Sequence, residues 1–346
     1  MSGDVVAPCP QAMTLGPGAI RRALFIRTDR LGETLLTLPA IAALKRALPD
    51  AALTLLVQPD LAPLLTGADG VGDIIAFAHA PREPWWREAI RLGRRLRPHR
   101  FDLVVVSNPK KELHLAAWLA GIPLRVGYGR KWGWLLTRRL ADRKALGDRH
   151  EVEYNLELVR ALGLPAAASG RQLPRFTREE GDVLRLLDPH GIGASTPFIA
   201  VHPWSSNPDK AWPADRYQGL IERAAGTLDM PVVLIGGPEE AKDAPSLMPE
   251  GRASVVNLVG RLSLTQLAAL LERARVLVSN DSGPVHLAAA VQTRTLVLFG
   301  TAAAATGPAR WGPWGRGHTV IWKPSMDAIT VDEVFAALST MLTRDG

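Results

Sequence analysis

Short apolar runs alternate with amphipathic stretches in the first half of the chain. The run ALFIR at residues 23–27 predicts a buried strand, and residues 34–48 carry apolar side chains at helical spacing up to Pro49. Further strands are predicted at residues 53–57, 74–77 and 102–106, and further helices at residues 85–96 and 112–119. Such alternation predicts a parallel sheet with helices on its faces.

The same pattern starts again after a predicted helix at residues 153–162 and a join rich in Gly, Pro, Ala and Ser. The second half predicts strands at residues 198–201, 231–235, 255–258, 276–279 and 295–299, and helices at residues 214–227, 265–273, 284–290 and 331–342. We therefore expect an α/β protein with two Rossmann-like, doubly wound domains that face a cleft. The predicted parts are a flexible leader at 1–20, an N-terminal domain at 21–165 and a C-terminal domain at 176–346.

Composition narrows the class of protein. A chain of 346 residues with 47% hydrophobic and 22% charged residues fits two globular domains and argues against disorder or a fibrous protein. The single cysteine, Cys9, argues against a disulfide framework, a cysteine-ligated zinc site and a cysteine nucleophile. We expect a cytoplasmic location, because the sequence has neither a secretory signal nor an apolar stretch of about 18 residues.

Positive charge is concentrated in the first half. Residues 21–170 hold 24 lysines and arginines against 15 acidic residues, whereas residues 171–346 hold 17 against 18. Such an uneven field attracts a polyanion, which can be nucleic acid, an anionic membrane surface or a phosphorylated substrate. Solvated arginines on surface helices are the simpler explanation.

The loop after the first predicted strand, residues 28–33, carries a candidate catalytic carboxylate. It leaves a strand end and enters a helix, so its side chains are expected at the ligand-binding edge of the sheet. Glu33 is a candidate general base there, with Gly32 allowing close approach of a substrate. Alternatively, Glu33 only complements the helix dipole, which is worth about 0.3–1 kcal/mol.

A second candidate site is the segment NDSGPVHLAAA at residues 280–290, between a predicted strand and a helix. Asp281 or Ser282 can cap this helix and Pro284 suits its first turn, so the free amides of the helix start are expected to bind an anion. His286 can contact a phosphate from the first turn, although a lone histidine is more often structural.

Two further loops follow predicted strands of the second half. Ser205, Ser206 and Lys210 supply hydroxyls and a mobile positive charge that suit a diphosphate; an exposed capping loop is the alternative. Glu239 or Glu240, after a Gly-Gly pair, can bind ribose hydroxyls, and the sequence does not distinguish between them.

Several motifs are missing from the sequence. There is no G-x-G-x-x-G at the first strand, no G-x-x-x-x-G-K-[ST] and no Asp-x-Asp pair, and the histidines are scattered. These absences argue against a nicotinamide dehydrogenase, a P-loop nucleotidase and a clustered metal site. We therefore expect neither a metal nor another cofactor.

Together these segments resemble glycosyltransferase family 9, the ADP-heptose:lipopolysaccharide heptosyltransferases. The resemblance runs from about residue 23 to about residue 342. It is carried by IRTDRLGETLLTLPAIAALKRALPDA, GYGRKWGWLLTRR, HPWSSNPDKAWP, GGPEE, LVGRLSLTQLAALLERARVLVSNDSGPVHLAAA and FGTAAAATGP. Each segment alone is a modest signal, whereas their common order and spacing are specific.

The resemblance implies an inverting, metal-independent transferase of the GT-B type. Its N-terminal half would bind the acceptor and its C-terminal half the nucleotide sugar. The catalytic carboxylate maps to Glu33, where the family commonly has aspartate. Diphosphate contacts map to Ser205, Ser206, Lys210, Ser282, Gly283 and His286, with Asp281 shaping the loop and Glu239 or Glu240 near the ribose.

The expected partners follow from the same resemblance. They are ADP-heptose or a related nucleotide sugar, a phosphorylated lipid A core as acceptor, and the cytoplasmic face of the inner membrane as a peripheral contact. Candidate acceptor-binding residues are Arg30, Lys110, Lys111, Arg130 and Lys131. Membrane contact is predicted for a run of tryptophans and arginines formed by Trp85, Trp86, Arg87, Arg91, Arg94, Arg95, Arg97 and Arg100.

Two alternatives remain beside this interpretation. One is a transferase of the same architecture with another nucleotide sugar or acceptor, or a catalytically silent relative, because Glu33 departs from the family's usual aspartate. The other is a nucleic-acid-binding protein that uses the basic half. No nucleic-acid recognition motif is present in the sequence, so we do not expect nucleic acid as a partner.

Overall fold

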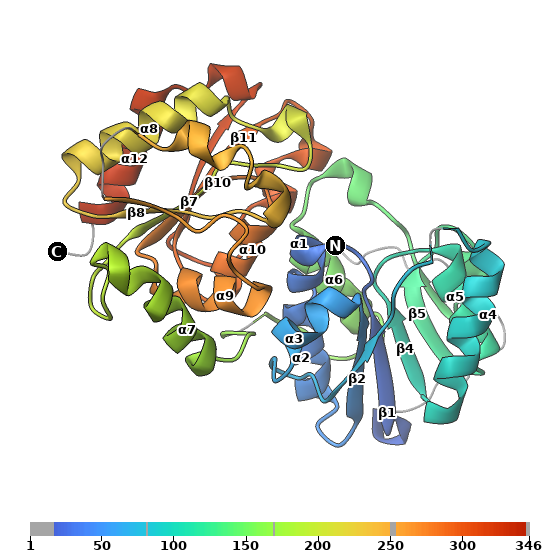
Figure 1. The fold of residues 1–346 in the computed structure, drawn as a ribbon. Coiled ribbons are helices and arrows are strands. Elements are labelled where there is room, and N and C mark those ends of the chain that lie inside the picture. The colour runs from blue at the N-terminus through green and yellow to red at the C-terminus, as the bar shows by residue number, and fades with distance from the viewer. Residues whose placement is uncertain (1–16, 81, 169, 250–253, 344–346) are drawn as a thin grey trace. The chain divides into compact units, whose positions relative to one another are not determined.

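The chain folds into two compact units, which are described separately. In the computed structural model, the first unit spans Met1–Pro174 and the second Arg175–Gly346 (Figure 1). The structure describes residues 17–80, 82–168, 170–249 and 254–343. Most of the predicted leader, including Cys9, lies outside these residues, while Ile20 at its end is buried.

The first unit is built on a six-stranded parallel sheet with strand order β3-β2-β1-β4-β5-β6. Its central strands are buried on both faces, which explains why they appear in the sequence as unbroken apolar runs. The strands are β1 (Arg22–Ile26), β2 (Ala52–Val57), β3 (Asp73–Ala76), β4 (Leu103–Val106), β5 (Leu124–Tyr128) and β6 (Arg138–Leu140).

Helices cover both faces of this sheet. The pair α4 and α5 packs on one face, and its core includes Leu92, Leu96 and Leu113, while α2 and α6 pack against one another (Figure 1). The helices are α1 (Leu31–Leu35), α2 (Leu38–Ala47), α3 (Ala62–Leu65), α4 (Trp85–Leu96), α5 (Lys111–Leu119) and α6 (Glu151–Arg160).

The predicted single helix at residues 34–48 is wrong in one respect, because the chain forms two helices there. α1 ends at Leu35 and α2 begins at Leu38. Pro39 has no N–H to donate to the Leu35 carbonyl, and its ring would collide with that carbonyl in a continuous helix. Proline is tolerated in a first turn, so α2 begins one residue before it.

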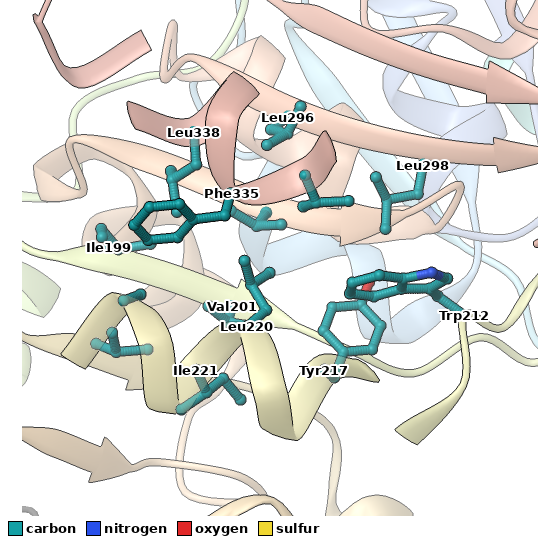
Figure 2. Close-up of a cluster of buried hydrophobic side chains, with 14 of the residues drawn as sticks. Ile199, Val201, Trp212, Tyr217, Leu220, Ile221, Leu296, Leu298, Phe335 and Leu338 are labelled. Carbon is teal, nitrogen blue, oxygen red and sulfur yellow. The ribbon is translucent and has the colours of Figure 1, made fainter. Parts of the chain in front are cut away.

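The second unit repeats the architecture with strand order β12-β11-β10-β7-β8-β9, again all parallel. Figure 2 shows part of its core, where Trp212 and Tyr217 meet edge to face with ring centroids 4.9 Å apart. The strands are β7 (Ile199–His202), β8 (Val232–Leu234), β9 (Val255–Asn257), β10 (Val276–Asn280), β11 (Thr295–Gly300) and β12 (Thr319–Lys323).

Helices α8 and α12 contact one another in the second unit, and α9 contacts both α7 and α10. The helices are α7 (Thr177–Leu187), α8 (Ala214–Thr227), α9 (Leu264–Arg273), α10 (Gly283–Ala290), α11 (Pro308–Trp311) and α12 (Val331–Thr343). Within the described residues, no helix has both the length and the apolar content needed to cross a membrane.

Candidate functional site

Three predicted loops of the second unit meet at one edge of its sheet. Strands β10, β7 and β8 are neighbours and run parallel, so their carboxyl ends lie together. The loop after β7 carries Ser205, Ser206 and Lys210, the loop after β8 carries Glu239 and Glu240, and the loop after β10 carries Asp281 and Ser282. In doubly wound folds, ligands bind at this edge.

His202 connects the loops after β7 and β10, because these two strands pair in register. His202 pairs with Ser279 across β7 and β10, and its Nδ1 lies 3.2 Å from the hydroxyls of both Ser279 and Ser282. The two hydroxyls are 3.0 Å apart. Ser282 occupies the N-cap position of α10, but its side chain makes no capping hydrogen bond. The predicted cap is therefore wrong for Ser282, whose hydroxyl joins the histidine instead.

The lysine of the β7 loop pairs with the aspartate of the β10 loop. Lys210 Nζ lies 2.5 Å from Asp281 Oδ2, and the side chains are 32% and 8% exposed. The buried Trp212 holds this loop, because its backbone N–H donates to Asn280 Oδ1 and its indole N–H donates to the Ile329 carbonyl. The Trp212 ring is thus structural, and it sets the position of Lys210 two residues earlier.

The β8 loop is shaped by close packing at glycine. A Cβ on Gly236 would come within 2.7 Å of the Trp204 ring, so glycine lets this aromatic ring lie against the loop. The following 3₁₀-helix, Pro238–Glu240, leaves Glu239 exposed and Glu240 half-buried. The Glu240 carboxylate lies over Gly237, close to where a Cβ would project.

The first turn of α10 has fewer free backbone N–H groups than an ordinary helix N-terminus. Pro284 has no N–H, and the Val285 N–H donates to the Ser282 carbonyl. Gly283 begins the helix, and His286 is buried in its first turn. An anion at this edge would therefore depend more on Lys210 and the serine hydroxyls than on the helix start.

Burial gives His202 a measurable effect on stability. Desolvation lowers the pKa of His202 to about 4, so this imidazole is neutral in the folded protein at neutral pH. The unfolded chain gains a proton near pH 6.5, whereas the folded chain gains it only near pH 4. Folded stability is therefore lost as pH falls through this window, by about 2 kcal/mol at pH 5.

We expect His202→Asn, which keeps an acceptor near the Nδ1 position, to remove this part of the pH dependence. The midpoints of urea unfolding at pH 7.5 and pH 5 measure this dependence. The matched control is His190→Asn, because His190 is exposed. Burial also lowers the pKa of His114 and of His318. The stability of the variant should therefore depend less on pH than that of the wild type, without becoming independent of pH. An unchanged slope in His202→Asn would show that His202 is not the group responsible.

In the first unit, the loops after β1 and β4 are likewise connected at the carboxyl edge of the sheet, because these two parallel strands end in register. Ile26 and Val106 end the β1–β4 pairing, and the next residues, Arg27 and Ser107, share a buried hydrogen bond of 2.8 Å. Asn108 Nδ2 then donates to Thr28 Oγ1 at 3.2 Å and to Asp29 Oδ1 at 3.0 Å. These contacts hold the β1 loop and the β4 loop together.

The two acidic side chains of the β1 loop and α1 have different surroundings. Asp29 Oδ2 lies 3.1 Å from the Arg27 guanidinium, and its other oxygen is 3.8 Å from Lys110 Nζ. Glu33 is half-buried in the five-residue α1, and among the described residues no side chain pairs with its carboxylate. Arg30 is exposed at the N-cap position of α1. Among the described residues, the Glu33 carboxylate is therefore less engaged by neighbouring cations than that of Asp29.

The four other predicted acceptor-binding cations lie in the loops after β4 and β5 or at the start of α5, and each has a local contact. Lys110 Nζ is 3.2 Å from His79 Nε2, and Lys111 Nζ lies 4.4 Å from the centre of the Trp85 ring. Arg130 pairs with Asp142 at 3.0 Å, and the Lys131 carbonyl lies 2.9 Å from His114 Nδ1.

One group among the described residues could hold a metal ion. His79, Glu88 and Glu112 place their ligand atoms within 4.8 Å of one another, which the scattered histidines of the sequence did not suggest. However, His79 Nδ1 already lies 2.5 Å from Glu88 Oε1, and its Nε2 lies 3.2 Å from both Thr28 Oγ1 and Lys110 Nζ. A cation at Nε2 would have to displace the Lys110 ammonium.

Several polar residues at these edges escaped the sequence reasoning. His79, Asn108, Asp29 and His202 all follow or end strands, but the sequence does not say which strands are neighbours. The usable sequence signal for these residues is their position just after a predicted strand or at its end.

Comparison with known proteins decides the family. The sequence profile of glycosyltransferase family 9 (heptosyltransferase) matches residues 89–335. The chain belongs to glycosyltransferase family 9. This glycosyltransferase is 24% identical to lipopolysaccharide heptosyltransferase 3 of Escherichia coli K12 over 340 residues, which cover 91% of this chain and 96% of that protein.

Solved structures agree on the fold. A family 9 glycosyltransferase from Veillonella parvula superposes with a TM-score of 0.82 at 21% identity, covering 93% of this chain and 97% of that one. E. coli ADP-heptose lipopolysaccharide heptosyltransferase II superposes with a TM-score of 0.78 at 23% identity, covering 94% and 99%. The predicted fold class of the glycosyltransferase, two doubly wound domains of the GT-B type, is confirmed.

Proposed function

We propose that this glycosyltransferase moves a heptose from ADP-heptose to the inner core of lipopolysaccharide, with inversion and without a metal ion. The acceptor would be Kdo-lipid A, where Kdo is the eight-carbon acidic sugar, or a core heptose. The names of the relatives support this choice, since they include lipopolysaccharide heptosyltransferases and an ADP-heptose enzyme. The first unit would bind the acceptor and the second the nucleotide sugar.

The observation that carries the proposal is the polar edge of the second unit. Lys210 and the hydroxyls of Ser205, Ser206 and Ser282 come from loops after β7 and β10, which are neighbouring strands. A diphosphate needs a cation and several donors at one place, and Lys210 is held there by Asp281. Gly283 and His286 would complete the diphosphate site, and Glu239 or Glu240 would bind the ribose.

The proposed reaction is a single displacement. Glu33 takes the proton of an acceptor hydroxyl while that oxygen forms a bond to the anomeric carbon of the heptose. The bond from the anomeric carbon to the diphosphate oxygen breaks, and its electron pair leaves with ADP. Attack from the face opposite ADP inverts the anomeric centre. Lys210 and the hydroxyls stabilise the charge that develops on the diphosphate, which is the role a metal ion would otherwise have.

Acceptor recognition would use the cationic loops of the first unit. Arg30, Lys110, Lys111, Arg130 and Lys131 lie in or beside loops that follow β1, β4 and β5. Parallel strands end at one edge, so these cations can act on the phosphates and carboxylates of a lipid A core together. Such an acceptor is embedded in a bilayer, and we infer a peripheral contact of the protein with the inner membrane at its cytoplasmic face.

The test is transfer by purified protein from ADP-heptose to a Kdo-lipid A acceptor in EDTA. We expect ADP release and an acceptor mass increased by one heptose, at the same rate with and without EDTA. Full loss of turnover in EDTA, restored by a divalent cation, would contradict metal independence. Consumption of a UDP- or GDP-sugar in place of ADP-heptose would favour the same-fold transferase with another donor. The anomeric configuration of the product, read by NMR, tests inversion.

A further inference from the structure

Helix α5 has an unusual outer face for a surface helix. Its inner side chains Leu113, Ala116 and Ala117 are buried in the core of the first unit. A surface helix normally carries polar side chains on the opposite face. Here that face carries the half-buried Leu115 and Trp118, which is 51% exposed. Among the described residues, α5 therefore presents a large apolar ring, Trp118, to solvent.

Neighbouring helix α4 shows the ordinary pattern. Its side chains Ala89, Leu92 and Leu96 are buried, whereas its arginines and the first-turn Trp86, 44% exposed, face solvent. The two helices lie side by side on the first unit (Figure 1), and a Cβ at Gly93 of α4 would lie only 2.9 Å from the Leu119 Cβ of α5. The predicted membrane segment in α4 therefore offers arginines and the tryptophans of its first turn, and α5 adds Trp118 to the apolar surface.

Three more tryptophans extend this apolar surface at the start of α5. The ring of Trp85 packs edge to face on Trp132 at 4.9 Å, and Trp132 lies 5.8 Å from Trp134. Trp132 is 39% and Trp134 67% exposed. Lys111, over the Trp85 ring, lies on the same stripe of α5 as Leu115 and Trp118, since residues four and seven apart share a face.

The loop that presents Trp132 and Trp134 is held in a strained shape. Lys131 and Trp132 have φ angles of 41° and 65°, a region that non-glycine residues rarely adopt. The hydrogen bond between buried His114 of α5 and the Lys131 carbonyl, 2.9 Å long, fastens this loop to the helix. Strain of this kind persists where the surroundings enforce it, and it is concentrated at functional sites.

Positive charge surrounds these aromatic rings. Residues 85–100 hold six arginines, and their one acidic residue, Glu88, is buried against His79. Lys131 is exposed beside Trp132, and Arg87 lies over the ring of Trp86. Amphipathic indole rings beside lysine and arginine fit the interface of a bilayer that contains anionic lipids.

We propose that Leu115, Trp118, Trp85, Trp132 and Trp134, here called the tryptophan surface, dock the protein on an anionic bilayer. The inference deepens the membrane contact proposed above and rests on that part of the proposed function. Indole rings enter the headgroup region, while Lys111, Lys131 and the arginines of α4 contact lipid phosphates.

The test is co-sedimentation with vesicles of phosphatidylcholine alone or of phosphatidylcholine and phosphatidylglycerol at 7:3. We expect the wild-type chain to bind the anionic vesicles, and the neutral vesicles at least about tenfold more weakly. The double variant Trp118→Ser/Trp134→Ser should lose about tenfold or more in partition to anionic vesicles, because both rings lose their apolar contact with lipid. Trp322→Ser is the matched control, since Trp322 is 53% exposed in the second unit.

The outcomes separate the explanations. Circular dichroism and unchanged turnover on a detergent-dispersed acceptor would show that the double variant is folded. Equal vesicle binding by wild type and double variant, or no binding by wild type, would overturn the inference. A wild-type dimer in analytical ultracentrifugation that the double variant loses, without vesicle binding, would instead make this surface a contact between copies. The vesicle assay contains no nucleotide sugar, so its failure leaves the proposed transfer reaction standing.

Discussion

Replacing Glu33 by glutamine is expected to reduce the turnover number of heptose transfer by about 10²–10⁴, the usual contribution of a positioned general base. Glutamine keeps the size of the side chain but cannot take a proton. Glu33→Asp should keep substantial turnover, because it restores the residue that the family commonly has at this position. ADP release measures turnover, and calorimetric titration with ADP should show unchanged affinity in all variants.

Two matched variants make the result specific to Glu33. Glu153 is also a first-turn glutamate, in α6, and it pairs with Arg160 at 3.0 Å. If Glu33 only complemented a helix dipole, Glu153→Gln and Glu33→Gln would have similar small effects on stability and none on turnover. Asp29→Asn tests the other carboxylate of the β1 loop. A large loss in Asp29→Asn together with near wild-type turnover in Glu33→Gln would move the proposed base to Asp29.

Replacing Lys210 by alanine is expected to weaken ADP-heptose binding and to lower turnover, each by about tenfold to a hundredfold. Hydrogen bonds to charged groups contribute about 1.5–3 kcal/mol, which corresponds to this range. The ammonium is also placed to meet the charge that grows on the departing diphosphate. Steady-state kinetics with ADP-heptose as the varied substrate separate the two effects. Lys210→Arg, which keeps the charge, should lose less.

The ion pair with Asp281 allows a sharper test of this assignment. Lys210→Ala also leaves the nearly buried Asp281 carboxylate without its cation, and that charge would repel a diphosphate. The double variant Lys210→Ala/Asp281→Asn removes this repulsion. Kinetic parameters that stay impaired in the double variant would support a direct contact of Lys210 with the donor. Recovery to wild-type values would mean that Lys210 only neutralises Asp281, contrary to the proposal.

The sequence reasoning worked best for strands that are buried on both faces. β1, β2, β4 and β10 are continuous apolar runs because helices cover both sides of a parallel sheet. It missed β5, β6 and β12, whose segments LRVGY, RRL and TVIWK mix apolar with charged side chains or glycine. It also missed α7, where charged residues dominate the first turn. β6 and β12 are edge strands, which carry weaker patterns because less of each is buried, whereas β5 is an inner strand whose apolar run is broken by arginine and glycine.

For the candidate site, the sequence indicated loops but not their partners. The roles assigned to Glu33, Lys210 and the serines stay predictions. What the structure adds are pairings between distant residues. Lys210 and Asp281 are 71 positions apart, and His202 and Ser279 are 77 apart. Such pairs depend on which strands lie side by side, and no local sequence pattern specifies the order of the strands.

The sequence by itself therefore determined the alternation of strands and helices, the two α/β halves and the motifs that identify family 9. Local patterns suffice for these, because the burial of each segment dictates its own residue types. Only the tertiary structure decided that α5 turns Trp118 outward, that Ser282 bonds His202 instead of capping α10, and that Asp281 holds Lys210. These outcomes depend on strand order, register and helix packing, which arise from contacts between segments far apart in the chain.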